Sequence, residues 1–113
     1  MELLAKEVRN CIDACFNCEK MCKETSTHCL HHGGKHAGPK HIGLMKDCAN
    51  LCRASAELML TNSEFSKEQC ALCAKVCNAC ADECSGFDES FMKECAKICR
   101  DCAKLCEEMS KEK

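Results

Sequence analysis

Residues 70–84 read CALCAKVCNACADEC, and this stretch decides the fold. Its five cysteines are separated by alternating steps of three and four residues. In an α-helix, such steps place side chains on one stripe, which is the pattern of the seam that faces the axis of a helical bundle. The stretch therefore predicts a helix whose inner seam carries cysteine where leucine or isoleucine ordinarily stands.

The same alternation of steps runs through the rest of the chain. Cysteines in 11–22 are spaced by four, three and four residues, and so are those in 95–106. The stretch 41–61 has only two cysteines, but other side chains continue their stripe. These side chains are His41, Met45, Ser55 and Met59. Every helical stretch therefore contributes one stripe to a common core.

Three breaks, rich in residues that end helices, divide the helical stretches: 31–40, 61–63 and 85–88. Short connections make successive helices antiparallel neighbours. We predict an all-α protein: an antiparallel up-down-up-down four-helix bundle with a Cys-lined core, forming a single domain over 1–113. The expected helices lie near 2–30, 41–61, 65–84 and 88–110, with a His/Gly loop at 31–40.

Two further local patterns predict where the last two helices begin. Ser66 and Gln69 have the spacing of a capping box. Asp88 follows a glycine stop and can cap the final helix.

Composition excludes several classes of protein. Sixteen basic and eighteen acidic residues give a formal charge of -2, which argues against nucleic-acid binding. No apolar run approaches the roughly 20 residues of a membrane span. The first residues, MELLAKEVRNC, lack an export signal, so we expect a cytoplasmic protein. In a reducing cytosol, sixteen cysteines favour metal ligation over disulfides.

Two readings without metal are weaker. A free cysteine often packs as a small buried hydrophobe, but a whole seam of cysteine packs less well than leucine and oxidises readily. Disulfides within one helix would be strained, since side chains at i and i+4 lie about 5–6 Å apart at Cβ and a disulfide needs about 3.8 Å. Disulfides between helices remain possible.

Metal binding fits the spacing better. Seven C-x-x-x-C pairs can each hold a soft monovalent ion between two thiolates, and thiolates select Cu(I), zinc or iron–sulfur clusters. Cu(I) brings one charge per one or two sulfurs, so we expect several Cu(I) ions per chain. The alternatives are a Zn(II)/Cd(II) detoxification protein and a redox or metal-shuttle module. The ferredoxin motif is absent, and a stripe of equivalent thiols does not suit an enzyme.

Residues 47–84, DCANLCRASAELMLTNSEFSKEQCALCAKVCNACADEC, resemble the bacterial four-helix-bundle copper storage proteins, cytosolic branch. The resemblance extends over essentially the whole chain. It implies a homotetramer of bundles that store Cu(I), with the inward cysteines as ligands. The ligands so implied are Cys11, Cys15, Cys18, Cys22, Cys29, Cys48, Cys52, Cys70, Cys73, Cys77, Cys80, Cys84, Cys95, Cys99, Cys102 and Cys106.

The histidine-rich loop is predicted to lie at one end of the bundle. The topology places its histidines near Met45, Cys84 and Met92. His41 and Met45 are the candidate ligands for copper access, because both continue the cysteine seam. Met59 and Met109 fall at the opposite end, where we expect them to fill the core. Buried thiols should stay protonated without metal, so each arriving ion displaces protons.

Overall fold

The computed structural model describes residues 4–112 and contains four long helices. The helices are α1 (Lys6–His32), α2 (Pro39–Leu60), α3 (Ser66–Cys84) and α4 (Ser90–Ser110), and a short 3-10 helix, η1 (Gly34–Ala37), lies between α1 and α2. No strand occurs within these residues. The all-α prediction is confirmed. The predicted first turn near residue 2 falls partly outside the described residues, and α1 begins at Lys6.

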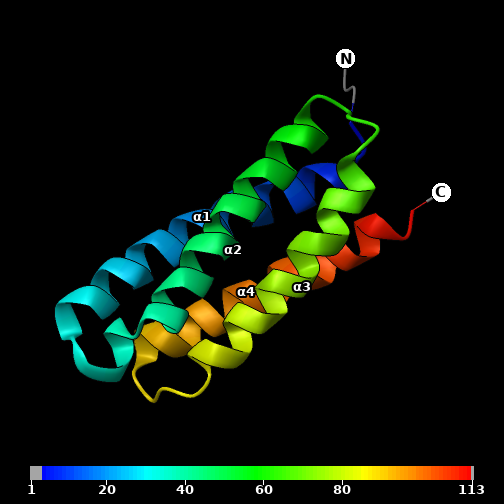
Figure 1. Ribbon diagram of the computed structural model, residues 1–113. Coiled ribbons are helices and arrows are strands. Elements are labelled where there is room, and N and C mark those ends of the chain that lie inside the picture. The colour runs from blue at the N-terminus through cyan, green and yellow to red at the C-terminus, as the bar shows by residue number, and fades with distance from the viewer. Residues whose placement is uncertain (1–3, 113) are drawn as a thin grey trace.

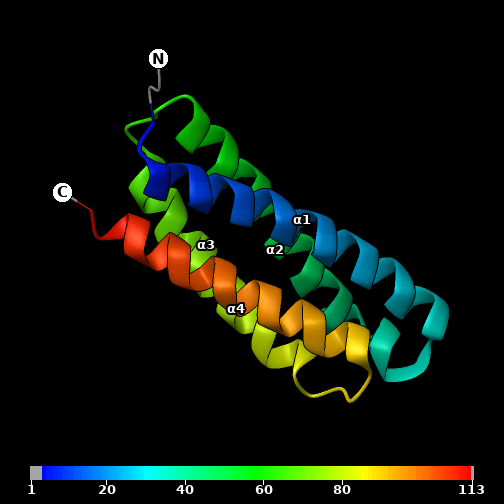
Figure 2. The ribbon, with the colours of Figure 1, turned by 180° about the vertical axis from the view of Figure 1, so that it is seen from behind.

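The helices are arranged as an antiparallel bundle, elongated to 48 × 23 × 17 Å (Figure 1). Each helix packs against two others: α1 contacts α2 and α4, and α3 contacts α2 and α4. Figure 2 shows the view from behind, with the α1–α2 and α3–α4 connections at one end and both termini at the other. The up-down-up-down topology is therefore confirmed.

The loop predicted at 31–40 is shorter than expected and contains the short helix η1. Helix α1 runs on to His32, and α2 begins at Pro39, which suits the first helical position because proline lacks an N–H donor. Gly33 and Gly34 have φ of 76° and 60°, a left-handed region that glycine enters without steric cost. This turn allows η1 to fold back and bury His36.

Both capping predictions are wrong. Ser66 lies inside α3, Phe65 occupies its N-cap, and the Gln69 amide donates instead to the Leu51 carbonyl of α2, at 3.2 Å. Glu89, not Asp88, is the N-cap of α4, and it makes no side-chain capping bond. Neither helix begins with a side-chain capping hydrogen bond.

A surface ion pair and the packed core also stabilise the bundle. Arg100 of α4 pairs with Asp82 of α3 and donates to the Asn78 side chain at 3.2 Å, so this seam is bridged at its surface. The core contains the cysteines together with alanines and four methionines near the helix ends. Within residues 4–112, none of the helices has the length and apolar character of a membrane span.

We predict that the reduced, metal-free protein is folded. The shortest of the four α-helices has 19 residues, longer than the about 12–15 residues at which isolated helices are marginal, and all four bury a common seam. Far-ultraviolet circular dichroism under anaerobic reducing conditions should show a mainly helical protein that unfolds cooperatively. A coil spectrum that becomes helical only on adding metal would contradict this expectation.

Candidate metal centre

All sixteen cysteines are free and buried, and they meet along the axis of the bundle. Each helix presents its cysteines on the stripe that the 3/4 spacing predicts, so the four stripes face one another. None of these cysteines is more than 1% exposed. The cysteines therefore line the core of the bundle as a column of sulfur, with Cys29 at its loop end.

The closest sulfur contacts join different helices. Cys48 and Cys52 of α2 each lie 3.5 Å from Cys77 of α3, measured between Sγ atoms. Cys15 of α1 lies 3.5 Å from Cys106 of α4. By comparison, Cys73 and Cys77, a C-x-x-x-C pair within α3, are 3.8 Å apart. Sulfur atoms on different helices thus lie at least as close to one another as this C-x-x-x-C pair within one helix.

These contacts build groups of three and four sulfurs whose atoms all lie within 4.8 Å of one another. Cys18, Cys52 and Cys102 each belong to two four-sulfur groups, so neighbouring groups share members. A shared thiolate can bridge two ions. Five of these groups, each drawn from three helices, are Cys15/Cys73/Cys102/Cys106, Cys18/Cys48/Cys52/Cys77, Cys18/Cys22/Cys48/Cys99, Cys52/Cys73/Cys77/Cys102 and Cys11/Cys70/Cys106.

Thiols in this column influence one another's protonation. Hydrogen bonds from Cys106 and other thiols lower the pKa of Cys102, and those from Cys18 and other thiols lower the pKa of Cys48. Contact with Cys102 and other thiols raises the pKa of Cys106, and contact with Cys18 and others raises the pKa of Cys22. The column can therefore hold a thiolate where a ring of S–H groups donates to it, while the rest stay neutral.

Cys29 stands apart from the column, at the loop end of α1. Its Sγ lies 3.5 Å from the Nε2 atom of His41 and 3.5 Å from the Sδ atom of Met92. Burial, with the nearby Cys95 and Glu89, raises the pKa of the Cys29 thiol to about 11. One thiol, one imidazole and one thioether thus meet at the end of the bundle.

His41 is buried, and burial lowers its pKa, which keeps the imidazole neutral and able to ligate metal. Its Nδ1 atom lies 3.8 Å from a Glu83 carboxylate oxygen. The Phe87 ring packs between His41 and His36, at centroid distances of 4.8 and 4.3 Å. Rigid aromatic packing therefore orients the imidazole toward Cys29.

The two ligands that the sequence associated with copper access lie one turn apart on α2 and have different neighbours. His41 contacts Cys29, whereas Met45, which is 1% exposed, lines a pocket with Cys22 further along the bundle. Met92, by contrast, was placed near this end but not among the ligands. A signal for it existed, because Met92 precedes Cys95 by three residues and so extends the stripe of α4.

The remaining histidines have other surroundings. His36 is buried in η1 and lies 3.0 Å from a carboxylate oxygen of Glu89, measured from its Nε2 atom. Hydrogen bonds from its own backbone amide and from His36 lower the pKa of Glu89. His28 and His31 line an open surface hollow with Glu24 and Thr27. Of the five histidines, only His41 contacts a cysteine in the described part of the chain.

Comparison with known proteins agrees with this geometry. The model of the copper storage protein family matches residues 4–111. The cysteine-rich protein YhjQ of Bacillus subtilis is 41% identical over 78 residues, covering 69% of this chain and 72% of that protein.

Solved structures show the same bundle. A Nitrosospira multiformis protein, Nmul_A1745, is 42% identical with a TM-score of 0.89, covering 93% of this chain and 95% of its own. The Cu(I)-bound copper storage protein BsCsp3 is 39% identical with a TM-score of 0.87, covering 93% and 99%. A cytosolic copper storage protein of Streptomyces lividans, solved with five coppers, is 27% identical with a TM-score of 0.81, covering 96% and 95%. The chain belongs to the copper storage protein family.

Proposed function

We propose that this chain stores Cu(I) in the cytosol, holding many ions in its thiol column and catalysing no reaction. The observation that carries the proposal is the sharing of sulfurs among groups drawn from all four helices. The related BsCsp3 is Cu(I)-bound, and the Streptomyces lividans relative is described as cytosolic and as holding five coppers. The proposed ligands are the sixteen cysteines, with His41, Met45 and Met92 as weaker ligands.

Charge favours Cu(I) over Zn(II) for this column. Tetrahedral zinc sites have Zn–S bonds of about 2.3 Å, which require sulfurs about 3.8 Å apart, so the distances between sulfurs alone admit zinc. Sixteen thiolates grouped in fours would, however, hold four divalent ions and keep eight uncompensated negative charges (16 − 8). Buried charge without compensation is costly. One Cu(I) per thiolate leaves the core neutral, and bridging sulfurs supply each ion with two or three ligands.

Storage requires ions to enter without unfolding the bundle. Cys29, His41 and Met92 form a mixed site at the loop end, and imidazole and thioether hold Cu(I) less tightly than thiolates do. Ions bound there can pass to the stronger thiolate groups deeper in the column. Protons leave as copper binds, so uptake weakens as the pH falls.

We also propose that the whole chain is one domain that assembles into a homotetramer. Several large apolar side chains lie on the surface of the bundle, and a contiguous group of such side chains marks an interaction surface. Phe65 and Leu72 are 57% and 45% exposed and are seven residues apart, which places them near one face of α3. Other copies of the same chain would cover them.

We predict that anaerobic titration of the reduced protein against a chromophoric Cu(I) chelator will show tight uptake of about ten or more ions per chain, because each bridging thiolate serves two ions. Saturation at one or two ions would identify a shuttle instead. An equal preference for Zn(II) in a competition titration would favour the detoxification alternative.

Loss of shared sulfurs should reduce this capacity out of proportion to the number removed. The variant Cys18→Ser/Cys52→Ser removes two thiols that each belong to two groups, so more than two ions should be lost. Ser55→Ala, buried on the same stripe of α2 but without sulfur, is the matched control and should keep the full capacity. Equal capacities in the two variants would contradict shared ligation.

We predict that the reduced, metal-free protein loses stability as the pH rises above about 9. The folded-state pKa of Cys29 is raised to about 11, so between 9 and 11 the unfolded chain ionises this thiol and the folded chain does not. Unfolding therefore becomes more favourable with each step of pH in that window. Urea denaturation under reduction should show a falling midpoint, with a smaller fall in Cys29→Ser.

The oligomer proposal predicts that Leu72→Lys dissociates the assembly, because burying a lysine in an apolar contact is costly. Light scattering coupled to size-exclusion chromatography should show a tetramer for the unmodified chain and a smaller species for the variant. Leu30→Lys, which changes a leucine of α1 that is 53% exposed, is the control. A monomeric unmodified chain would contradict the proposal.

A further inference from the structure

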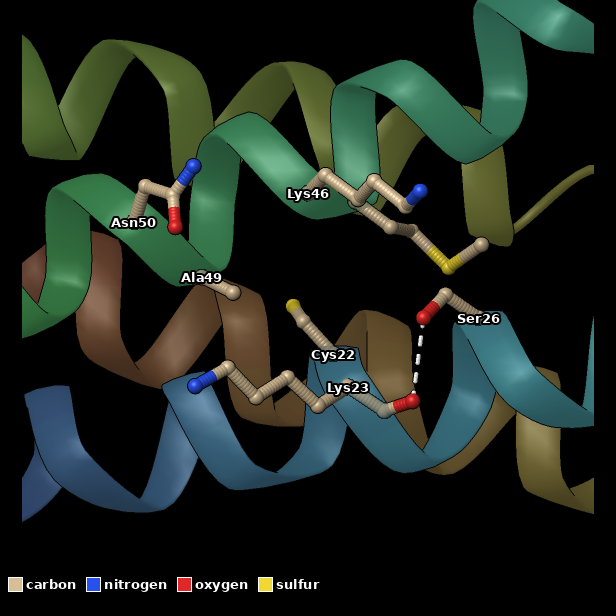
Figure 3. A pocket seen from close by; sticks show the side chains of 7 residues that line it. Cys22, Lys23, Ser26, Lys46, Ala49 and Asn50 are labelled. Carbon is tan, nitrogen blue, oxygen red and sulfur yellow. Dashed lines mark hydrogen bonds between the residues drawn. The ribbon is translucent and has the colours of Figure 1, made fainter.

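A pocket opens on the side of the bundle, between α1 and α2, away from the loop end. Its volume is about 120 Å³, and buried thiol and thioether groups, Cys22 and Met45, belong to its wall. Figure 3 shows the Cys22 sulfur pointing from α1 toward Ala49 of α2. The space exists because small side chains, Ser26 and Ala49, line this contact between α1 and α2, and larger ones would fill it.

Two lysines flank the mouth of this pocket. Lys23 projects from α1 and Lys46 from α2, and both are exposed (Figure 3). Lys23 also pairs with Glu19 on its own helix at 2.7 Å, and the Ser26 hydroxyl donates to the Lys23 carbonyl at 2.9 Å. The pocket thus has two lysines at its rim, one of them paired with Glu19, and a buried thiol and thioether in its wall.

The floor of the pocket leads directly into the thiol column. Cys22 belongs to the group Cys18/Cys22/Cys48/Cys99, and its Sγ lies 3.7 Å from that of Cys99 on α4. Within the described residues, the α1–α2 seam also lacks a surface bridge like the one that Arg100 makes between α3 and α4. In the part of the chain that the structure describes, the side-chain hydrogen bonds joining α1 to α2 involve sulfur: Cys18–Cys48 and Cys29–His41.

We propose that this pocket is a lateral docking site for anionic Cu(I) complexes of small thiols, which deliver copper to Cys22 without passing the loop end. This inference rests on the proposed storage function. The lysines attract the anionic complex, and Met45 offers the first ligand inside. The copper then exchanges one thiolate for another: a Cu–S bond to the small thiol breaks, a Cu–Sγ bond to Cys22 forms, and the Cys22 proton leaves on the departing thiolate. Copper stays Cu(I), so no electron donor is needed.

The test compares loading rates at unchanged capacity. Stopped-flow ultraviolet absorbance of the copper–thiolate bands would follow transfer from Cu(I)–glutathione, which is anionic, and from tetrakis(acetonitrile)Cu(I), which is cationic. Lys23→Glu/Lys46→Glu should load about tenfold more slowly from the anionic donor, because steering by charge changes association rates by about 10-fold or more. Added salt should slow the unmodified chain but not the variant.

Matched variants separate this site from general effects. Lys75→Glu/Lys104→Glu makes the same change of charge on α3 and α4 and should leave the rate from Cu(I)–glutathione nearly unchanged. Ser26→Leu fills the pocket and should slow loading several-fold, whereas Thr27→Leu, the exposed neighbour, should not.

Loading of both pocket variants at the rates of their controls would overturn the lateral site while leaving storage untouched. A low final copper content in the unmodified chain would instead overturn the storage function. Circular dichroism of each variant confirms that the bundle is intact, so that a slow rate reports on docking.

Discussion

Contact between sulfur atoms across the bundle axis is the constraint on which the rest of the structure depends. A seam built from cysteine brings the helices together around side chains smaller than leucine, and the column of Sγ atoms fills the space between them. Sulfurs 3.5 Å apart on α2 and α3, and on α1 and α4, fix which helices face each other. Packing and metal ligation therefore use the same atoms, and neither can be changed alone.

The sequence was sufficient to predict the helices, their order and the inward stripe, because steps of three and four residues have a direct geometric meaning on a helix. It could not predict which sulfurs meet. Periodicity fixes the direction of a side chain around its own helix, but the axial register of two helices depends on their loops and flanking residues. The contact between Cys52 and Cys77 is of this kind.

The ends of the helices show the same limit. Ser66 and Gln69 have capping spacing, but the Gln69 amide instead reaches the Leu51 carbonyl on the neighbouring helix. The topology predicted Met92 at this end of the bundle, but not its contact with Cys29, which depends on how far α1 and α4 extend. The burial of His36 follows from the turn at Gly33 and Gly34, whose backbone angles no periodicity describes. Local patterns are overridden wherever segments distant in sequence supply a better partner.

Burial of every thiol has a consequence for the surface charge of the protein. When one Cu(I) replaces one thiol proton, the core gains no charge, and the exposed side chains remain those of the empty chain. The formal charge of -2 is then the same for a full and an empty bundle. A partner that contacts only the outer faces therefore meets the same charges whatever the copper content of the core. Only a contact that reaches the buried sulfur atoms can distinguish a full bundle from an empty one.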